Sequence, residues 1–534
     1  MTKYILKKPI IALIAITILG TLIRILGANW GMPVPLNPDE GTIVDSAIRM
    51  TEHHSFEPDM FARPDHLEIQ INMIVDVFIS HVFYKLPIQE MAQFHKDLLF
   101  TSARVITALF GVGMIVLSYL IGVKIKKAIG LIAALIFALF PGFIEYSHYA
   151  SPDIPTGFFM LLCIYFCIRY MQKPAVSNLA LICLSISAFI AVKYPGLILC
   201  SFVAIIVILR GIEDRSLKRI FAHGLMAMIM VPGFLFLISP VLFTNYQAVK
   251  ASLIGESNPI RPGADGLGYW GNLLFYFQTY LSYSGLILFF FFLCGIYAFI
   301  KKKVDIKLIP IFFGLIYFVM LSYIGLHWER WAVPMYVSPL LISSVGVYFV
   351  YRYLKNYGLK KGNLFKTFFY VAFSIVLLNL SITSMAKLIN FLVPDTRVAS
   401  QSYCRANNVN VENTNFEGYS PLFPTSPKLL DPLLNNGGKY YETNPKIKYI
   451  LLSNQVYGRY TFDPQRFKEQ NDLLNGIATQ YKLIKEYTPA QLKSSPFDLL
   501  NIIYSAKYLY QVQQKHYVGP LLKFYKVNEV NYKS

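Results

Sequence analysis

The segment IIALIAITILGTLIRIL, residues 10–26, decides the fold class, because it is an apolar run of nearly the length that crosses a lipid bilayer as a helix. Basic residues between Lys3 and Lys8 precede it, as they do in a signal peptide, but no small-residue cleavage site follows. We therefore expect a retained signal anchor whose N-terminus lies in the cytoplasm.

Ten further apolar runs of near-spanning length follow, so the sequence predicts about eleven transmembrane helices. The composition agrees, because 55% of the 534 residues are hydrophobic and only 15% are charged. The chain is thus predicted to be an α-helical polytopic membrane protein rather than a soluble domain. The further runs cover residues 101–123, 128–145, 155–171, 177–192, 195–210, 222–242, 283–300, 307–326, 331–351 and 367–393.

The net charge of +19 is explained by topology and does not require a nucleic-acid partner. Lysine and arginine cluster in every second gap between the apolar runs, as the positive-inside bias predicts. The alternation places the N-terminus in the cytoplasm and the C-terminus outside it. The basic residues in these gaps are Lys124, Lys126, Lys127, Lys173, Arg210, Arg215, Lys218, Arg219, Lys301, Lys302, Lys303, Arg352, Lys355, Lys360, Lys361 and Lys366.

The stretch from Leu67 to Leu86 is long enough to span a membrane, but we expect it to lie in the interface. Polar residues recur every four positions along it and form one stripe of a helix. If this stretch spanned, every later basic loop would change sides, so we place it in an outer first loop that covers residues 28–100. The stripe consists of Glu68, Asn72, Asp76 and Ser80.

The composition changes after Pro394, which predicts two domains. Residues 1–393 are expected to form the transmembrane domain, and residues 394–534 a soluble extracytoplasmic α/β domain with short apolar runs between turn signals. Five of the six cysteines lie in apolar segments and only Cys404 lies outside them, so neither a disulfide framework nor a zinc site is indicated.

Charged and polar residues gather on the outer face that this topology defines. Two carboxylates in Asn37-Pro38-Asp39-Glu40 follow the first span directly. Ordinary roles remain open for several of these residues, including a solvated loop acid for Asp39, an interfacial lysine for Lys193 and a structural ion pair with Glu329 or a neighbour for Arg330. The other outer-face candidates are Arg63, His148, Asp153, Lys193, His327 and Arg330.

Outer-loop histidines are the residues that could suggest a metal site. Isolated loop histidines are more often simple polar residues than ligands. We therefore predict no metal and no other cofactor, although a divalent ion would be compatible with such a site. The histidines considered are His53, His54, His66 and His148.

Carboxylates and cations together at a membrane surface suit a group-transfer reaction. An acidic residue can take the proton of a hydroxyl nucleophile, while arginine and lysine neutralise a phosphate leaving group. A polyprenyl phosphate would keep its tail in the bilayer, and this requirement would explain why an enzyme is so apolar.

The order of the outer-face motifs resembles the GT-C superfamily, and more narrowly the branch that holds the protein O-mannosyltransferases and the lipid A aminoarabinose transferases. The resemblance covers about residues 1–350 well and the C-terminal domain in outline. The motifs are Asp39-Glu40, Arg63-Pro64, Ser102-Ala103-Arg104, Pro152-Asp153, Lys193-Tyr194-Pro195-Gly196, and His327 with Arg330 ahead of Val333-Pro334.

This resemblance implies an inverting transfer of a sugar from a polyprenyl-phosphate donor to an acceptor hydroxyl of a lipid, protein or polysaccharide. The reaction would take place on the outer face of the cytoplasmic membrane. Asp39, Glu40 and Asp153 would be the catalytic residues, with Asp39 acting as the base or orienting the acceptor. The substrate-binding residues would be Arg63, His148, Lys193, His327 and Arg330.

Two positions depart from the family pattern. His148 stands where arginine is frequent, and Trp331 follows Arg330 where tyrosine is commoner. These departures concern the residues that contact the phosphate rather than the class of reaction.

Two other classes of function fit parts of this pattern. A secondary transporter or flippase of lipid-linked or small polar substrates would place its charges deep within the spans and often shows inverted repeats, whereas these charges gather at one face. A membrane-anchored binding protein would hardly need eleven spans. The sequence therefore favours a glycosyltransferase.

Overall fold

The computed structural model describes residues 2–256, 268–301, 305–324, 327–361, 364–422, 446–461 and 464–530. The chain forms two compact units. One unit comprises Met1–Ala28, Asp39–Leu388 and Lys493–Ala506, and the other comprises Asn29–Pro38, Ile389–Leu492 and Lys507–Ser534. Lys302 and Lys303, which the topology prediction places in a cytoplasmic loop, lie outside the described residues.

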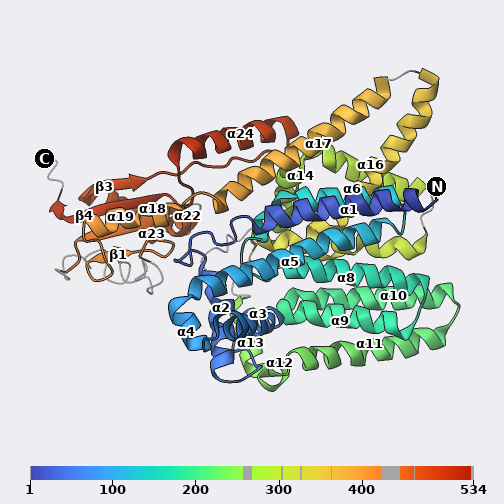
Figure 1. Ribbon diagram of the computed structural model, residues 1–534, viewed down its shortest axis with the longest axis horizontal. Helices are drawn as coiled ribbons and strands as arrows, with labels where there is room; N and C mark the ends of the chain where they lie inside the picture. The colour runs from blue at the N-terminus through green and yellow to red at the C-terminus, as the bar shows by residue number, and fades with distance from the viewer. Residues whose placement is uncertain are drawn as a thin grey trace. The chain divides into compact units, whose positions relative to one another are not determined.

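Long helices make up most of the first unit (Figure 1). Within the described residues, each of the eleven predicted apolar runs falls mainly on helical structure, which confirms an α-helical polytopic membrane protein. The last two residues of the run 307–326 lie outside the described residues. The helices that carry these runs are α1 (Thr2–Ile25), α5 (Lys96–Gly122), α6 (Lys127–Leu139), α8 (Asp153–Gln172), α9 (Val176–Val192), α10 (Cys200–Glu213), α11 (Leu217–Ile238), α14 (Gly268–Lys301), α15 (Phe313–Leu321), α16 (Val333–Lys361) and α17 (Leu364–Leu388).

Shorter helices connect these long ones and carry much of the candidate site. In the first unit they are α2 (Pro38–Glu52), α3 (His66–Phe78), η1 (Ile79–Tyr84), α4 (Ile88–Phe94), α7 (Pro141–Tyr146), η2 (Tyr194–Leu199), α12 (Val241–Thr244), α13 (Tyr246–Glu256), η3 (Ile306–Phe312) and η4 (Glu329–Ala332). By length and composition, eight helical segments of the described chain could cross a membrane, and four shorter apolar helices accompany them.

One of these eight segments is His66–Tyr84, formed by α3 and η1, which the sequence predicts to be interfacial. Its apolar face is open, with Ile74 and Phe78 more than half exposed. Ser102 and Thr107, both in the N-terminal half of α5, donate hydrogen bonds to carboxylates of the stripe. The polar face is thus turned toward the protein, and the interfacial position stays a prediction. Buried residues include the whole stripe, Glu68, Asn72, Asp76 and Ser80.

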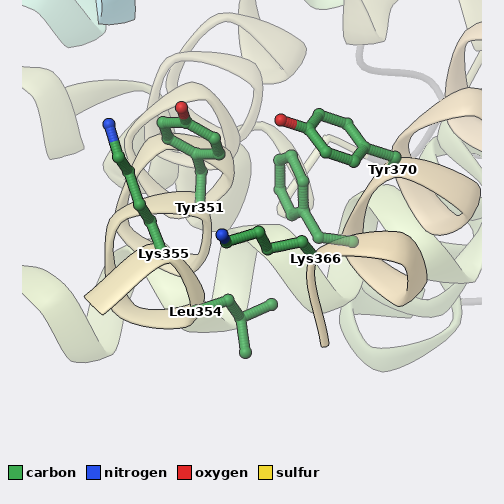
Figure 2. A pocket seen from close by; sticks show the side chains of 6 residues that line it. Tyr351, Leu354, Lys355, Lys366 and Tyr370 are labelled. Carbon is green, nitrogen blue, oxygen red and sulfur yellow. The ribbon is translucent and has the colours of Figure 1, made fainter. Parts of the chain in front are cut away.

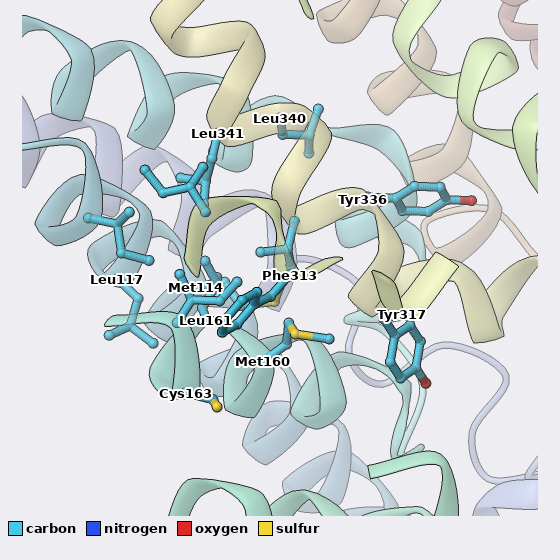
Figure 3. Packing of buried hydrophobic residues seen from close by; sticks show 14 of the residues in the cluster. Met114, Leu117, Met160, Leu161, Cys163, Phe313, Tyr317, Tyr336, Leu340 and Leu341 are labelled. Atoms are coloured by element: carbon cyan, nitrogen blue, oxygen red, sulfur yellow. The ribbon is translucent and has the colours of Figure 1, made fainter. Parts of the chain in front are cut away.

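One continuous apolar core holds the helices of the first unit together. Figure 3 shows Met114, Leu161 and Phe313 packed side by side, from α5, α8 and α15. Helices α14 and α16 approach closely because Gly295 and Gly346 lie between them, and a Cβ on either residue would collide with the backbone of the facing helix.

The second unit contains a four-stranded sheet. Its strands are β1 (Thr414–Phe416), β2 (Tyr449–Ser453), β3 (Tyr481–Tyr487) and β4 (Leu522–Val530), in the order β1-β2-β4-β3. Strand β1 runs parallel to β2, and the other pairs are antiparallel. Apolar residues cover both faces, with Ile450 and Leu452 on one and Leu451 and Phe524 on the other. The small α/β domain is therefore confirmed.

Helices accompany this sheet along the C-terminal part of the chain. They are η5 (Ile389–Phe391), α18 (Thr396–Ala399), α19 (Gln401–Ala406), α22 (Asn454–Thr461), α23 (Lys468–Gln480) and α24 (Asp498–Lys515). Residues 493–506 group with the first unit rather than with the sheet. The domain boundary at residue 394 stays a prediction.

Candidate active site

Asp39 lies in the first turn of α2, where two arginines from distant parts of the chain reach it. Arg330 Nη1, from η4, lies 2.5 Å from Asp39 Oδ2, and Arg63 Nη1 lies 3.5 Å from the same oxygen. Between a fifth and a third of each of these three side chains is exposed. Together they form a partly open carboxylate that is flanked by cations.

The charges around Asp39 decide its protonation. Burial tends to raise the pKa of Asp39, but the positive charges of Arg330 and Arg63 outweigh burial and hold this pKa below its ordinary value. Asp39 is therefore ionised at neutral pH, and a carboxylate in this state can accept a proton only weakly while both arginines stay in place.

A second pair, Asp153 and Lys193, lies beside these residues. Lys193 Nζ donates a hydrogen bond of 2.8 Å to Asp153 Oδ1, and it lies 5.1 Å from the centre of the Trp331 ring. Burial lowers the pKa of Lys193, and the nearby charges of Arg330 and Arg63 lower it further against the opposing effect of Asp153. Five of the predicted site residues thus form one electrostatically connected cluster: Asp39, Arg63, Asp153, Lys193 and Arg330.

Arg63 is held in the cluster by a fully buried carboxylate. Its Nε donates to Asp65 Oδ2 at 2.6 Å, and its Nη2 donates to Thr42 Oγ1 at 3.1 Å. The backbone N–H of Asp65 in turn donates to the carbonyl oxygen of Val192, immediately before Lys193. Sequence reasoning missed Asp65, although it stands two residues after Arg63 and ahead of the polar stripe.

Glu40 follows Asp39 in the sequence but lies inside the protein. Its carboxylate and the Arg104 guanidinium are both fully buried and make two hydrogen bonds, of 2.8 and 2.7 Å. The backbone N–H of Ala150 also donates to Glu40 at 3.0 Å, and Arg104 donates to the carbonyl oxygen of Ala28. Glu40 therefore joins α2 to α5 and to the segment before α8, and Arg104 extends this connection to the residues that follow α1.

The two predicted histidines are buried, and their rings contact backbone carbonyls or another ring. The ring nitrogens of His148 each lie 2.8 Å from a backbone carbonyl, those of Ile144 and Leu26, and burial lowers the pKa of His148 to about 4. His327 is mostly buried, and its ring packs 4.3 Å from the ring of Phe275. The structure thus gives both histidines packing roles, and their contact with a substrate stays a prediction.

A further network of charged and hydroxyl groups lies behind Arg330, and sequence reasoning missed it. Lys387 Nζ lies 2.8 Å from Glu145 Oε2, and the hydroxyl of Tyr283 lies 3.0 Å from Glu145 and 3.2 Å from Glu329. Lys387 sits inside an apolar run, which is the only local signal that could have drawn attention to it. The network restrains Glu329 and so supports η4, which carries Arg330.

The described residues contain no group of three or more histidine, cysteine, aspartate or glutamate side chains that could hold a metal ion. The cluster around Asp39 instead offers one partly open carboxylate and three cationic side chains. Such a set can bind an anionic group and can accept a proton next to it.

Comparison with known proteins gives one family match. Residues 57–246 match the model of the dolichyl-phosphate-mannose-protein mannosyltransferase family. This range includes Arg63, Asp153 and Lys193. No curated protein sequence matches the chain significantly.

The fold also resembles solved membrane proteins. The oligosaccharyltransferase of Archaeoglobus fulgidus in the apo form superposes with a TM-score of 0.54 at 11% identity, covering 97% of this chain and 88% of that one. Its complex with an inhibitory peptide and a dolichol-phosphate gives a TM-score of 0.50 at 10% identity, over 97% and 88% of the chains. ArnT of Cupriavidus metallidurans bound to undecaprenyl phosphate gives a TM-score of 0.48 at 13% identity, over 85% and 94%. The resemblance to the GT-C superfamily is confirmed by the family match and the shared fold.

Proposed function

On the premise of a GT-C fold in a multi-pass membrane protein, we propose that this chain is a glycosyltransferase that moves a sugar from a polyprenyl-phosphate carrier to an acceptor hydroxyl. The observation that carries this proposal is the partly open Asp39 carboxylate, which Arg330 and Arg63 bracket. The dolichol-phosphate bound by the archaeal protein of similar fold supports a polyprenyl phosphate as the leaving group.

The cations of the cluster would receive the phosphate. The bond between the anomeric carbon and the phosphate oxygen breaks in the transfer, and negative charge grows on that oxygen. Arg330 and Arg63 both contact the same oxygen of Asp39, and their charges act on Lys193, so we propose that one phosphate engages all three. Electrostatic stabilisation of a leaving group is commonly the largest single contribution to catalysis.

Asp39 would act as the base, and donor binding would activate it. When the phosphate draws Arg330 and Arg63 toward itself, Asp39 loses the two charges that hold its pKa down. The carboxylate then takes the proton of the acceptor hydroxyl as the hydroxyl oxygen attacks the anomeric carbon opposite the phosphate. Such an in-line displacement inverts the anomeric centre. Transfer is thereby coupled to the presence of the donor.

The remaining acids have supporting roles in this proposal. Asp153 fixes Lys193 through a buried hydrogen bond and keeps the ammonium group aimed into the cluster. Glu40 positions α2 through Arg104 rather than reacting itself. The site would lie on the outer face of the cytoplasmic membrane, as the distribution of basic loops indicates.

A labelled donor tests this proposal. Purified protein would be incubated with polyprenyl phosphates that carry different radiolabelled hexoses or pentoses, together with a membrane extract that supplies acceptors. We expect one labelled sugar to move to a new acceptor and an equal amount of polyprenyl phosphate to be released. In sealed vesicles that contain the protein, the intact labelled donor could instead cross the membrane without cleavage of the bond between sugar and phosphate. The protein would then be a flippase or transporter.

A further inference from the structure

A pocket of about 140 Å³ opens between α16 and α17 (Figure 2). It lies beside the basic gap between the apolar runs 331–351 and 367–393. A single buried water needs roughly a tenth of this volume, so the pocket can hold a small headgroup. Figure 2 shows Lys366 reaching from α17 toward α16. The lining residues are Tyr351, Leu354, Lys355, Lys366, Phe369 and Tyr370.

The residues that line the pocket favour a negatively charged ligand. Its two ionisable amines, Lys355 and Lys366, have no acidic neighbour in the lining, and the sequence contains no aspartate or glutamate between Glu329 and Asp395. The hydroxyl groups of Tyr351 and Tyr370 add two hydrogen-bond donors. Ammonium and hydroxyl groups on residues that line one pocket suit the oxygens of a phosphate.

The position of the pocket favours a membrane lipid as the ligand. The apolar segments Glu329–Asn356 and Leu364–Phe391 both terminate beside it, which places the pocket at the boundary between hydrocarbon and water. Leu364, Phe368 and Val371 are more than half exposed on the first turns of α17, where acyl chains can contact them.

A rigid aromatic wall forms the back of the pocket. Phe369 is almost fully buried, and its ring centre lies 5.6 Å from that of Tyr351 and 6.2 Å from that of Phe291. These contacts tie α17 to α16 and α14. The apolar side of the cavity therefore exists before any ligand arrives.

We propose that the pocket between α16 and α17 binds the phosphate headgroup of an anionic membrane phospholipid, with Lys355 and Lys366 on the phosphate and Leu354 and Phe369 against the glycerol backbone. None of the residues that line this pocket belongs to the Asp39 cluster. Binding of a lipid here therefore does not depend on glycosyl transfer. Basic pockets between membrane helices are a recurrent way of holding such headgroups.

Native mass spectrometry of the purified full-length protein tests this inference. The protein would be equilibrated with phosphatidylglycerol or with phosphatidylcholine of the same acyl chains. The test variant is K355Q/K366Q, and the matched control is K301Q/R352Q, which removes two positive charges from α14 and α16 outside the lining. We expect wild type and control to bind phosphatidylglycerol roughly thirtyfold more tightly than the test variant, as for two lysines facing an anionic lipid.

Several outcomes would overturn the inference. These are equal binding of the two lipids by wild type, unchanged phosphatidylglycerol binding by K355Q/K366Q, and equal losses in the test variant and the control. If inorganic phosphate alone bound with the same dependence on Lys355 and Lys366 and displaced the lipid, the pocket would be a site for free phosphate. K355Q alone, at an exposed position, keeps the test valid if the double variant does not fold.

Discussion

Asp39 and Glu40 are consecutive acids on α2, yet they lie in opposite environments. Asp39 is one third exposed and shares one oxygen with Arg330 and Arg63, while Glu40 is fully buried and both its oxygens are taken by Arg104 and a backbone N–H. One helical residue step rotates a side chain by about 100°. That rotation places the Asp39 carboxylate where a substrate can contact it, and it places the Glu40 carboxylate inside the protein, where it stabilises the fold.

The comparison shows that an acidic pair in sequence need not be a catalytic pair. The exposed member is surrounded by cations that a phosphate can recruit. The buried member is committed to a salt bridge, and breaking such a bridge leaves an uncompensated charge inside the protein. Substitution of Asp39 should therefore lower activity, whereas substitution of Glu40 should lower stability.

The largest expected effect is that of Asp39→Asn on activity. Loss of a general base should slow sugar transfer by roughly 10²- to 10⁴-fold, while the partly open position leaves folding nearly unchanged. Asp45→Asn is the matched control, because Asp45 lies on the same helix in an exposed ion pair with Lys96. Equal rates for the two variants would show that Asp39 is not the base.

Glu40→Gln should act on stability instead. Removing one partner of a buried ion pair typically costs about 3–5 kcal/mol, and Arg104 would be left without its counter-ion. We expect a clearly lower midpoint of thermal unfolding in detergent. The double variant Glu40→Leu/Arg104→Met should recover much of this loss, since it removes both charges. A normal midpoint for Glu40→Gln combined with lost transfer would instead make Glu40 a catalytic residue.

Substitution of the cations should give smaller losses that do not add. Arg330→Gln should lower kcat/KM by roughly 10- to 150-fold, because a hydrogen bond to a charged group is worth about 1.5–3 kcal/mol. Lys193→Gln should lower kcat/KM less in the Arg330→Gln variant than in the wild-type protein, since both residues contact one phosphate in this proposal. Independent penalties that simply sum would argue against a shared phosphate.

The smallest expected effect is a shift in pH dependence. Asp39 is ionised because Arg330 and Arg63 depress its pKa, so activity should be lost only as the pH falls through this low value. Arg330→Gln removes one of these charges, and the acid limb of kcat/KM should then move to higher pH. An acid limb that does not move would mean that Arg330 does not control the protonation of Asp39.

Much of this architecture follows from the sequence because its signals are local. Apolar runs predict where the helices lie, and the charge of alternate loops brings Asp39, Arg63, Asp153, Lys193 and Arg330 to one candidate site. The buried partners could not be predicted, because they depend on packing between distant segments. Asp65 and Lys387 belong to no motif, and the motif that contains Arg104 does not reveal that Arg104 pairs with Glu40. The separation of Asp39 from Glu40 depends on how α2 is rotated.

The most direct test of the central claim is an experimental structure of the protein with polyprenyl phosphate bound. We predict that phosphate oxygens will lie within hydrogen-bond distance, about 3 Å, of Arg330, Arg63 or Lys193, and that Asp39 will have lost at least one arginine contact. A phosphate that is bound away from these residues, with both arginines still on Asp39, would contradict the proposed active site.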